Sequence, residues 1–371
     1  MALEHLLGGT LKFYTEGIDM GKKIAILISV TAFCVGLFSA AGAVAAEEKF
    51  VWKMASSWPK GTILQETPDQ FADMVTKMSN GRLVIKSYAA GVLVGALEVM
   101  EAAQMGTIQA AHCSPSYQVG KIPAAPLFGY IPFGMEAIPY LTWMYEGEGM
   151  GLYQELYKDF NLGYATVCGI LPSEDLAWSN KPIKTMEDFK GMKFRTSGYW
   201  GELLSAAGAS VMMLPAGEVY EALQRNVLDA GEFSIPSMDK DLAFYEIAKY
   251  LLVPGIHQTS TIFDLTINKN AWEKLPPDLQ EIVKVAAQTI TMRTLTKCIY
   301  HDISALQFFK EKGVTIEYLS PEIQKELSVK ANDLMAQKAA KDPFFAKVWD
   351  SQKKFRAGYL NYKSLMTPQY E

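Results

Sequence analysis

The feature of this sequence that most constrains its fold is a regular alternation of short apolar segments with amphipathic ones. Strands are predicted at residues 50–55, 83–88 and 108–113, with helices between them at 65–78 and 96–105. In the first helix the apolar residues recur three or four positions apart, so they lie on one face. Two successive strand–helix units predict a parallel sheet, because the chain must cross over before the next strand begins. We therefore expect an α/β protein.

The same pattern begins again after a loop at 114–135 that is rich in proline and glycine. A helical stretch ending near residue 160 leads into further strands, predicted at 162–170, 192–195, 210–214 and 230–233. Helices are predicted at 199–207 and 218–225, a capping box at 185–188 opens a short helix, and 178–183 is predicted to be a turn-rich connection. This repetition predicts a second α/β lobe.

A long helix is predicted after the second lobe, because the chain has no helix breaker between Pro277 and Gly313. A helix of that extent is about 50 Å long, which is enough to cross both lobes. Ser320 and Pro321 then predict the start of a final helix, since serine caps helices and proline suits the first turn.

The amino-terminal segment has the layout of an export signal. Lys22 and Lys23 precede an apolar run from 24 to 46, and the alanines at its end provide a small-residue cleavage site. An uncleaved membrane anchor is the alternative, because the run is nearly long enough to span a bilayer. We expect residues 1–46 to be an extension and a cleaved signal peptide, and we expect Met20 to be the natural start.

The composition excludes several classes of protein. Residues 1–46 contain three basic and three acidic residues, so the mature chain keeps the formal charge of −5. This acidic balance does not favour nucleic-acid binding, which requires a basic face. Three cysteines remain, Cys113, Cys168 and Cys298, so at most one disulfide can form and buried free thiols are expected.

Signatures of common enzymes are absent from the sequence. There is no G-x-S-x-G elbow, no H-E-x-x-H and no C-x-x-C. After the leader the chain has only three histidines, which leaves few candidates for acid–base chemistry. We therefore expect that the protein is not an enzyme.

One region carries a family resemblance in the order and spacing of its motifs. The motifs are WSNKPI at 178–183, TMEDFKGMKFR at 185–195, PAGEVYEALQ at 215–224 and NVLDAGEFSIP at 226–236. This region resembles the solute-binding proteins of tripartite ATP-independent periplasmic (TRAP) transporters, the DctP family, and the likeness extends over essentially all of the mature chain. It is closest in look to the branch that binds 2-oxo acids and other monocarboxylates.

The resemblance implies a two-lobed periplasmic binding protein fold with a ligand cleft between the lobes. We expect residues 47–171 with 259–300 to form one lobe and 172–258 with 301–371 the other, braced by the long helix. The implied function is to bind a small organic acid in the periplasm and deliver it to integral-membrane subunits of a TRAP transporter. An ion gradient would power the uptake.

Arg195 matches the arginine with which family members hold the ligand carboxylate. A guanidinium presents paired donors in one plane and can bind both carboxylate oxygens at once. Its place at the end of a predicted strand suits this role, because ligands of open α/β sheets bind beyond the carboxyl ends of strands.

The resemblance also implies a metal ion. In the 2-oxo acid branch a cation is bound by positions that match Glu174 and Glu232, and Phe233 is a further candidate for this metal site. A glutamine is expected where this chain has Glu174. Two carboxylates at one site suit a hard cation, calcium or sodium. Alternatively, Glu174 binds a ligand amine or is solvated. Phe233 replaces the asparagine of many relatives, which disfavours dicarboxylates and sialic acid as ligands.

Aromatic residues are expected to wall the pocket. Trp58, Tyr117, Trp200 and Phe233 each follow a predicted strand, and they favour a ligand with an apolar or aromatic side chain. The alternative for each is ordinary core packing. His257 is a further candidate, as a hinge or a pocket residue. The rival function is a secreted enzyme with Glu174 and Glu232 as an acid–base pair.

Overall fold

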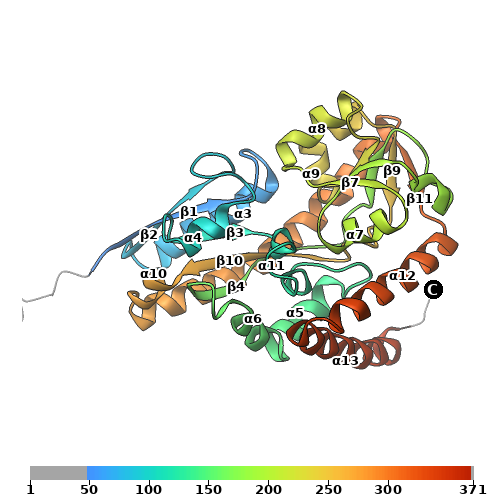
Figure 1. Cartoon of the computed structure of the whole chain (residues 1–371). Coiled ribbons are helices and arrows are strands. Elements are labelled where there is room, and N and C mark those ends of the chain that lie inside the picture. Colours follow the sequence, from blue (N-terminus) through green and yellow to red (C-terminus); the bar gives the residue numbers. More distant parts are fainter. Residues whose placement is uncertain (1–47, 369–371) are drawn as a thin grey trace, which may run out of the picture. The chain divides into compact units, whose positions relative to one another are not determined.

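The first of two β-sheets is mixed and has five strands in the order β2-β1-β3-β10-β4 (Figure 1). The strands are β1 (Phe50–Ser56), β2 (Leu83–Tyr88), β3 (Ala110–Cys113), β4 (Leu162–Leu171) and β10 (Thr261–Asn268). β1 pairs in parallel with β2 and β3, as predicted, whereas β10 is antiparallel to both of its neighbours. The computed structural model describes residues 48–368, and the predicted signal peptide and cleavage site lie outside them.

The second sheet has six strands in the order β11-β9-β5-β8-β6-β7. They are β5 (Ala177–Ser179), β6 (Lys193–Arg195), β7 (Ser210–Met212), β8 (Ala230–Gly231), β9 (Tyr250–Val253) and β11 (Thr315–Tyr318). β5 is antiparallel to β8 and β9, and the other pairings are parallel. Each sheet is the centre of one lobe, so the prediction of a two-lobed α/β fold is confirmed.

Helices cover both sheets. In the first lobe they are α3 (Ile63–Met78), α4 (Val99–Gln104), α5 (Ala137–Glu146), α6 (Gly149–Tyr157) and α10 (Lys269–Glu273). In the second lobe they are α7 (Gly198–Ala206), α8 (Ala216–Gln224) and α9 (Pro236–Asp241), with short 3-10 turns such as Met186–Phe189. That turn begins with the predicted capping box, in which Thr185 and Asp188 bond each other's backbone.

The long helix α11 (Pro277–Glu311) contributes to the cores of both lobes. Its first half buries Leu279, Val283 and Ile290 among residues of the first sheet. Its second half buries Ala305 and Phe309 among residues of the second lobe, with the rings of Phe309 and Trp178 4.9 Å apart. The predicted long helix that spans both lobes is therefore confirmed.

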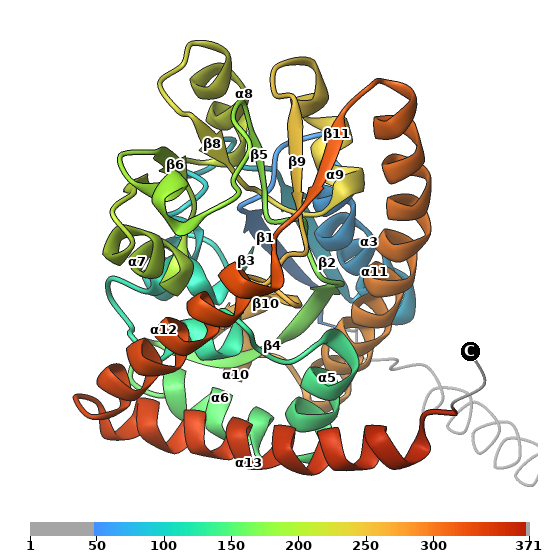
Figure 2. The same ribbon diagram turned by 90° about the vertical axis from the view of Figure 1, so that its right-hand side faces the viewer.

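Two more helices end the described chain, where the sequence predicted one. Ser320 caps α12 (Pro321–Ala339) as expected. Asp342 then accepts hydrogen bonds from the backbone of Phe344 and Phe345 and starts α13 (Pro343–Met366). α13 contacts α5 of the first lobe and passes below α5 and α6 in Figure 2. Its Phe345 lies in the core of that lobe. The predicted lobe boundaries stay a prediction.

Residues 178–183 were predicted to be a turn-rich connection. This is wrong for 178–179, which belong to a strand, whereas 180–183 have no regular structure, as predicted. Three further strands were not predicted. Trp178 belongs to β5, which pairs with both β8 and β9 in the middle of the second sheet. β9, β10 and β11 were not predicted. β10 is buried along its whole length and therefore has no alternation of polar and apolar residues.

β10 also carries a buried carboxylate that is satisfied inside the first lobe. Asp264 accepts hydrogen bonds from the hydroxyl groups of Tyr153 and Tyr157 at 2.6 and 3.4 Å, and from the thiol of Cys113 at 3.2 Å. Burial nevertheless raises the pKa of Asp264 to about 6. The cysteines at 113, 168 and 298 are free and buried, as expected.

Within residues 48–368, no helix combines the length and the apolar character needed to cross a bilayer.

Candidate functional site

A small cavity lies between the two lobes, and we call it the interlobe pocket. It is lined by Trp58, Leu64, Ser114, Tyr117, Tyr130, Glu174, Arg195, Ser197, Phe233, Ser234, Gln258, Thr261 and Phe263. Its volume is about 20 Å³, which is room for about one water molecule. Five of the lining side chains are aromatic, those of Trp58, Tyr117, Tyr130, Phe233 and Phe263, and two are charged, those of Glu174 and Arg195.

The fold brings these residues together at the carboxyl ends of strands. Trp58 follows β1, Glu174 follows β4, Arg195 ends β6 and Phe233 follows β8. In open α/β sheets such strand ends form the binding edge, because the chain leaves the sheet there in loops. The connection between β9 and β10 adds His257 and Gln258.

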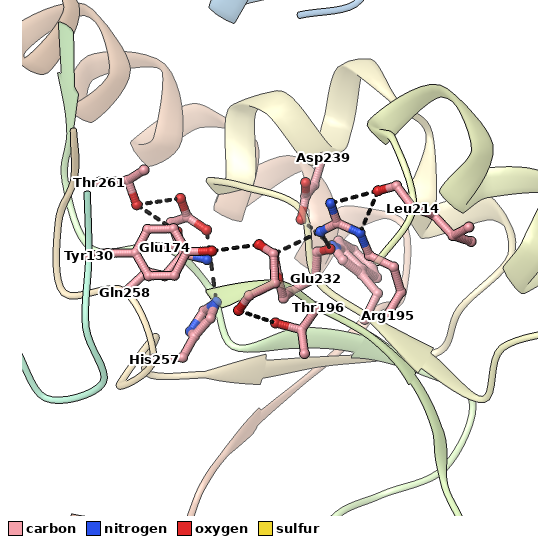
Figure 3. Close-up of polar contacts among 12 residues, drawn as sticks. Tyr130, Glu174, Arg195, Thr196, Leu214, Glu232, Asp239, His257, Gln258 and Thr261 are labelled. Atoms are coloured by element: carbon pink, nitrogen blue, oxygen red, sulfur yellow. Dashed lines mark hydrogen bonds and ion pairs between the residues drawn. The ribbon is translucent and has the colours of Figure 1, made fainter. Parts of the chain in front are cut away.

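Arg195 is buried, and its guanidinium is held by the second lobe (Figure 3). Nε and Nη2 donate to the backbone carbonyl of Leu214 at 3.0 and 2.9 Å. Nη1 donates to the backbone carbonyl of Glu232 and to its carboxylate, the latter at 3.2 Å. These four hydrogen bonds occupy four of the five N–H groups of a guanidinium. The paired donors that were expected to hold a ligand therefore face Leu214 in this conformation.

Phe233 packs against the charged group of Arg195. The centre of its ring lies 5.2 Å from the guanidinium carbon, within the range of a cation–π contact. On the opposite wall, Trp58 packs on Phe263 and Tyr117, with ring centres 4.3 and 6.4 Å away. The hydroxyl groups of Tyr130 and Ser197 are hydrogen-bonded at 2.5 Å and link the two lobes beside the pocket.

Glu174, Glu232 and His257 form a buried cluster that could hold a cation. One ligand atom from each lies within 4.8 Å of the other two. Among the described residues, Glu232 Oε1 and both ring nitrogens of His257 have no hydrogen-bond partner. Buried polar atoms without partners are costly, so this donor set fits a bound cation.

Neighbouring side chains orient Glu174 within this cluster. Thr261 donates to its Oε1 at 2.8 Å. The amide of Gln258, assigned with its nitrogen toward the carboxylate, donates to both oxygens at 2.9 and 3.2 Å. Figure 3 shows Thr261 and Gln258 on the side of Glu174 away from Arg195.

The negative charges of Glu174 and Glu232 are only partly compensated by the positive charge of Arg195, and the pKa values of the cluster reflect this. Burial raises the pKa of Glu174 well above its usual range, and the charge of Glu232 adds to the rise. Burial lowers the pKa of His257 to about 3, helped by the charge of Arg195, so its imidazole is neutral and can accept or coordinate. A cation at this point would favour the ionised form of Glu174.

A second buried pair of carboxyl groups lies behind the cluster and was not predicted. Asp239 accepts a hydrogen bond from the indole of Trp178 at 2.7 Å. Burial raises the pKa of Asp239 to about 8, and burial together with the charge of Asp239 raises that of Asp175 well above its usual range. At least one proton is therefore held between these carboxyl groups at neutral pH.

The predicted site residues are distributed as follows. Trp58, Tyr117, Glu174, Arg195 and Phe233 line the interlobe pocket, and Glu232 and His257 lie directly behind it. Trp200 lies in the core of the second lobe, with its ring 5.7 Å from that of His257, and it does not belong to the lining residues.

The sequence analysis did not identify Tyr130, Ser197, Thr261 and Phe263 as pocket residues. Thr261 and Phe263 lie on the strand that was not predicted, so no signal placed them at the site. Ser197 directly precedes α7, and no sequence motif singled it out.

The sequence profile described as "Bacterial extracellular solute-binding protein, family 7" matches residues 54–342. This chain belongs to that family. The match covers both sheets apart from the first part of β1, together with α11 and α12, and it includes every residue of the interlobe pocket. The family resemblance stated from the motifs is therefore confirmed.

Known relatives of this family 7 solute-binding protein agree in sequence and fold. The monocarboxylate 2-oxoacid-binding periplasmic protein of Nostoc sp. is 33% identical over 320 residues, which are 86% of this chain and 88% of that protein. A TRAP transporter solute-binding protein from Bordetella bronchiseptica, solved with calcium and picolinate, has a TM-score of 0.84 at 28% identity, covering 86% of this chain and 95% of that one.

A second solved structure is equally similar. The TRAP periplasmic solute-binding protein from Pseudoalteromonas atlantica, solved with sodium and pyruvate, has a TM-score of 0.82 at 30% identity, covering 86% of this chain and 97% of that one. The family and these structures are those of solute-binding proteins and not of enzymes, so the prediction that the chain is not an enzyme is confirmed.

Proposed function

We propose that this family 7 protein binds a small 2-oxo monocarboxylate, together with a cation, in the interlobe pocket. The observation that carries the proposal is the meeting of Arg195, the Glu174–Glu232 pair and an aromatic wall at one small cavity. The relative from Nostoc is named for 2-oxo acids, and the two solved structures contain a carboxylate together with calcium or sodium.

Charge balance supports a cation as part of the site. The formal charges of Glu174, Glu232 and Arg195 sum to −1, since two carboxylates oppose one guanidinium. A carboxylate ligand would raise this imbalance to −2 in a buried place, where unpaired charge is strongly unfavourable. One calcium ion would restore neutrality, and it prefers the oxygen ligands that the two glutamates supply.

Arg195 supplies the positive charge for the ligand in this proposal. Because four of its N–H groups are already bonded inside the second lobe, the side chain is held rigidly at the pocket. A ligand carboxylate would be bound by the remaining N–H and by the charge, or by both paired donors after release of the Leu214 carbonyl. Such charge-assisted hydrogen bonds are about twice as strong as neutral ones.

The aromatic wall supports a ligand with a short apolar side chain. Trp58, Tyr117, Phe233 and Phe263 surround a cavity of only about 20 Å³, so a ligand enters only when the lobes open and is enclosed when they close. Hinge motion of this kind is common in two-lobed binding proteins. The predicted lobes are 47–171 with 259–300 and 172–258 with 301–371. We propose that they move with one change: α13 moves with the first lobe, because its Phe345 lies in the core of that lobe.

The proposed partners follow from the family. The ligand-bound protein would dock on integral-membrane subunits of a TRAP transporter and release the acid to them, with an ion gradient as the source of energy. Cleavage of the predicted signal peptide would place the protein in the periplasm.

Binding is tested by calorimetry and thermal denaturation with pyruvate, with and without calcium. A ligand at 100 times its dissociation constant should add about 2.7 kcal/mol of stability. Arg195→Lys keeps the charge beside Glu232 but loses the planar fork, so we expect the pyruvate-induced shift to vanish while the protein stays folded. Arg225→Lys, at an exposed arginine, is the matched control. An unchanged shift in Arg195→Lys would remove Arg195 from the site.

A further inference from the structure

His112 is a buried residue behind the pocket wall that none of the roles above uses. It lies on β3 and is completely buried. The indole Nε1 of Trp58 donates to its Nδ1 at 2.7 Å. Since an indole N–H can only donate, Nδ1 must be the accepting nitrogen. Nε2 therefore carries the proton and donates to the backbone carbonyl of Cys168 at 2.9 Å.

The backbone carbonyl of Cys168 can accept this hydrogen bond because the pairing of β4 with β10 is irregular at this point. The pairing of β4 with β10 shifts between Ile262 and Asp264, so that Cys168 and Gly169 stand opposite the single residue Phe263. Such a bulge leaves ladder groups unpaired and changes the direction of side chains. Here it provides an acceptor for His112 and also directs Phe263 onto Trp58, with ring centres 4.3 Å apart.

Trp58 is therefore fixed from two sides. Phe263 packs on its ring, and His112 holds its only polar atom at 2.7 Å, with the two rings edge to face. A buried indole N–H without an acceptor would be costly, so the hydrogen bond selects one orientation of the ring. That ring lines the interlobe pocket, whereas His112 does not touch it.

We propose that His112 is a positioning residue that sets the size selectivity of the pocket by holding Trp58 in one orientation. This inference rests on the proposed function, because it concerns the length of the ligand that the pocket accepts. With the indole fixed, the wall stands close to the ligand and admits a short side chain. With the indole released, the ring can turn and leave space for a longer one.

The protonation state of His112 agrees with this role. Burial lowers its pKa to about 4, so the ring is neutral at neutral pH and Nδ1 keeps the lone pair that accepts from Trp58. The charge of Asp69 acts against this lowering of the pKa but is outweighed by burial.

The test compares pyruvate with 4-methyl-2-oxopentanoate by calorimetry in calcium buffer, using the full mature chain. His112→Phe keeps an aromatic ring but removes both hydrogen bonds. We expect this variant to improve the affinity for the longer acid relative to pyruvate, so that the ratio of the two dissociation constants changes at least about fivefold. This change corresponds to the effect of about one hydrogen bond. His112→Asn can place its amide oxygen where Nδ1 was, so we expect a ratio within about twofold of the parent. His301→Phe and His301→Asn, on the exposed face of α11, are the matched controls.

Trp58→Phe should shift the ratio in the same direction as His112→Phe, and the double variant should add nothing, since both changes remove one interaction. The indole N–H resonance of Trp58, assigned by its loss in Trp58→Phe, should move in ligand-free His112→Phe and stay in place in the His301 variants. If His112→Phe does not fold, Trp58→Phe and His112→Asn decide the question.

The inference is overturned if the parent binds pyruvate and His112→Phe leaves the ratio unchanged, or if His112→Asn shifts it as much as Trp58→Phe does. If the parent binds neither acid, with or without calcium, the proposed function is overturned and this inference with it. The two failures are therefore distinguishable.

Discussion

The guanidinium of Arg195 lies 3.2 Å from the carboxylate of Glu232, and both side chains are buried at the edge of the interlobe pocket. A buried ion pair is destabilised strongly when only one partner is removed, because the other charge is left uncompensated. The proposed binding of the ligand by Arg195 therefore couples ligand binding to the stability of the second lobe.

Arg195→Ala should lower the free energy of unfolding by about 3–5 kcal/mol, because it leaves Glu232 buried without its cation. The double variant Arg195→Ala/Glu232→Ala should lose less than the sum of the two single changes. Urea denaturation of the ligand-free protein in the presence of EDTA measures both. Additive losses would mean that the pair does not interact.

Glu174→Gln should weaken calcium binding at least about tenfold and favour sodium, because it removes one of the two negative charges while keeping an oxygen ligand. Calorimetric titration of each cation in the presence of pyruvate is the measurement. Glu187→Gln, at an exposed glutamate, should leave both affinities unchanged. Equal calcium affinity in Glu174→Gln and the parent would exclude Glu174 as a ligand of the ion.

Tyr130→Phe should speed the release of pyruvate about fivefold, because it removes the hydrogen bond to Ser197 that links the lobes and a hydrogen bond contributes about 1 kcal/mol. Stopped-flow displacement gives this rate. Tyr362→Phe, at an exposed tyrosine of α13, is the control. Unaltered release in Tyr130→Phe would show that the contact does not hold the closed form.

Asp264 should make the first lobe less stable as the pH rises from about 4 to about 6. Its pKa in the folded protein is raised from the ordinary 3.8 to about 6, so the folded state binds the proton more tightly than the unfolded state. The stabilisation is complete below the unfolded value and is lost as the pH passes the folded one. The full difference is about 3 kcal/mol.

Asp264→Asn cannot titrate, so its unfolding free energy should change less steeply between pH 4 and pH 6 than that of the parent. Denaturant titrations at several pH values measure the two slopes. Asp350→Asn, at an exposed aspartate, should keep the parent's slope. Parallel curves for the parent and Asp264→Asn would contradict the raised pKa.

The alternation of apolar and amphipathic segments in the sequence predicted the α/β class. The prolines, glycine and serine near the helix ends predicted the bounds of α11 and the start of α12. Of the strands that were not predicted, β10 is buried along its whole length, so its sequence has no alternation of polar and apolar residues. β9 and β11 are only four residues long, which is too short for a clear pattern. Trp178 was placed in a turn because the residues after it favour turns, although its own side chain packs in a core.

For the site, the motif around Arg195 and the acidic residues at 174 and 232 predicted side chains that the fold brings together at the interlobe pocket. Their role in binding a ligand stays a prediction. The carbonyl of Leu214 that engages Arg195 could not be predicted, because a backbone acceptor has no sequence signature. Trp58 was identified, but its partner His112 depends on a sheet irregularity near Cys168 that only the register of β4 and β10 reveals.

α11 supplies apolar side chains to the hydrophobic cores of both lobes. Neither lobe therefore has a complete core without this shared helix. A fragment that contains one lobe and α11 would expose the apolar side chains with which α11 packs on the other lobe. A fragment without α11 would have a gap in its core. The two lobes should therefore unfold together. Thermal unfolding should give a single calorimetric peak, although the protein has two separate sheets.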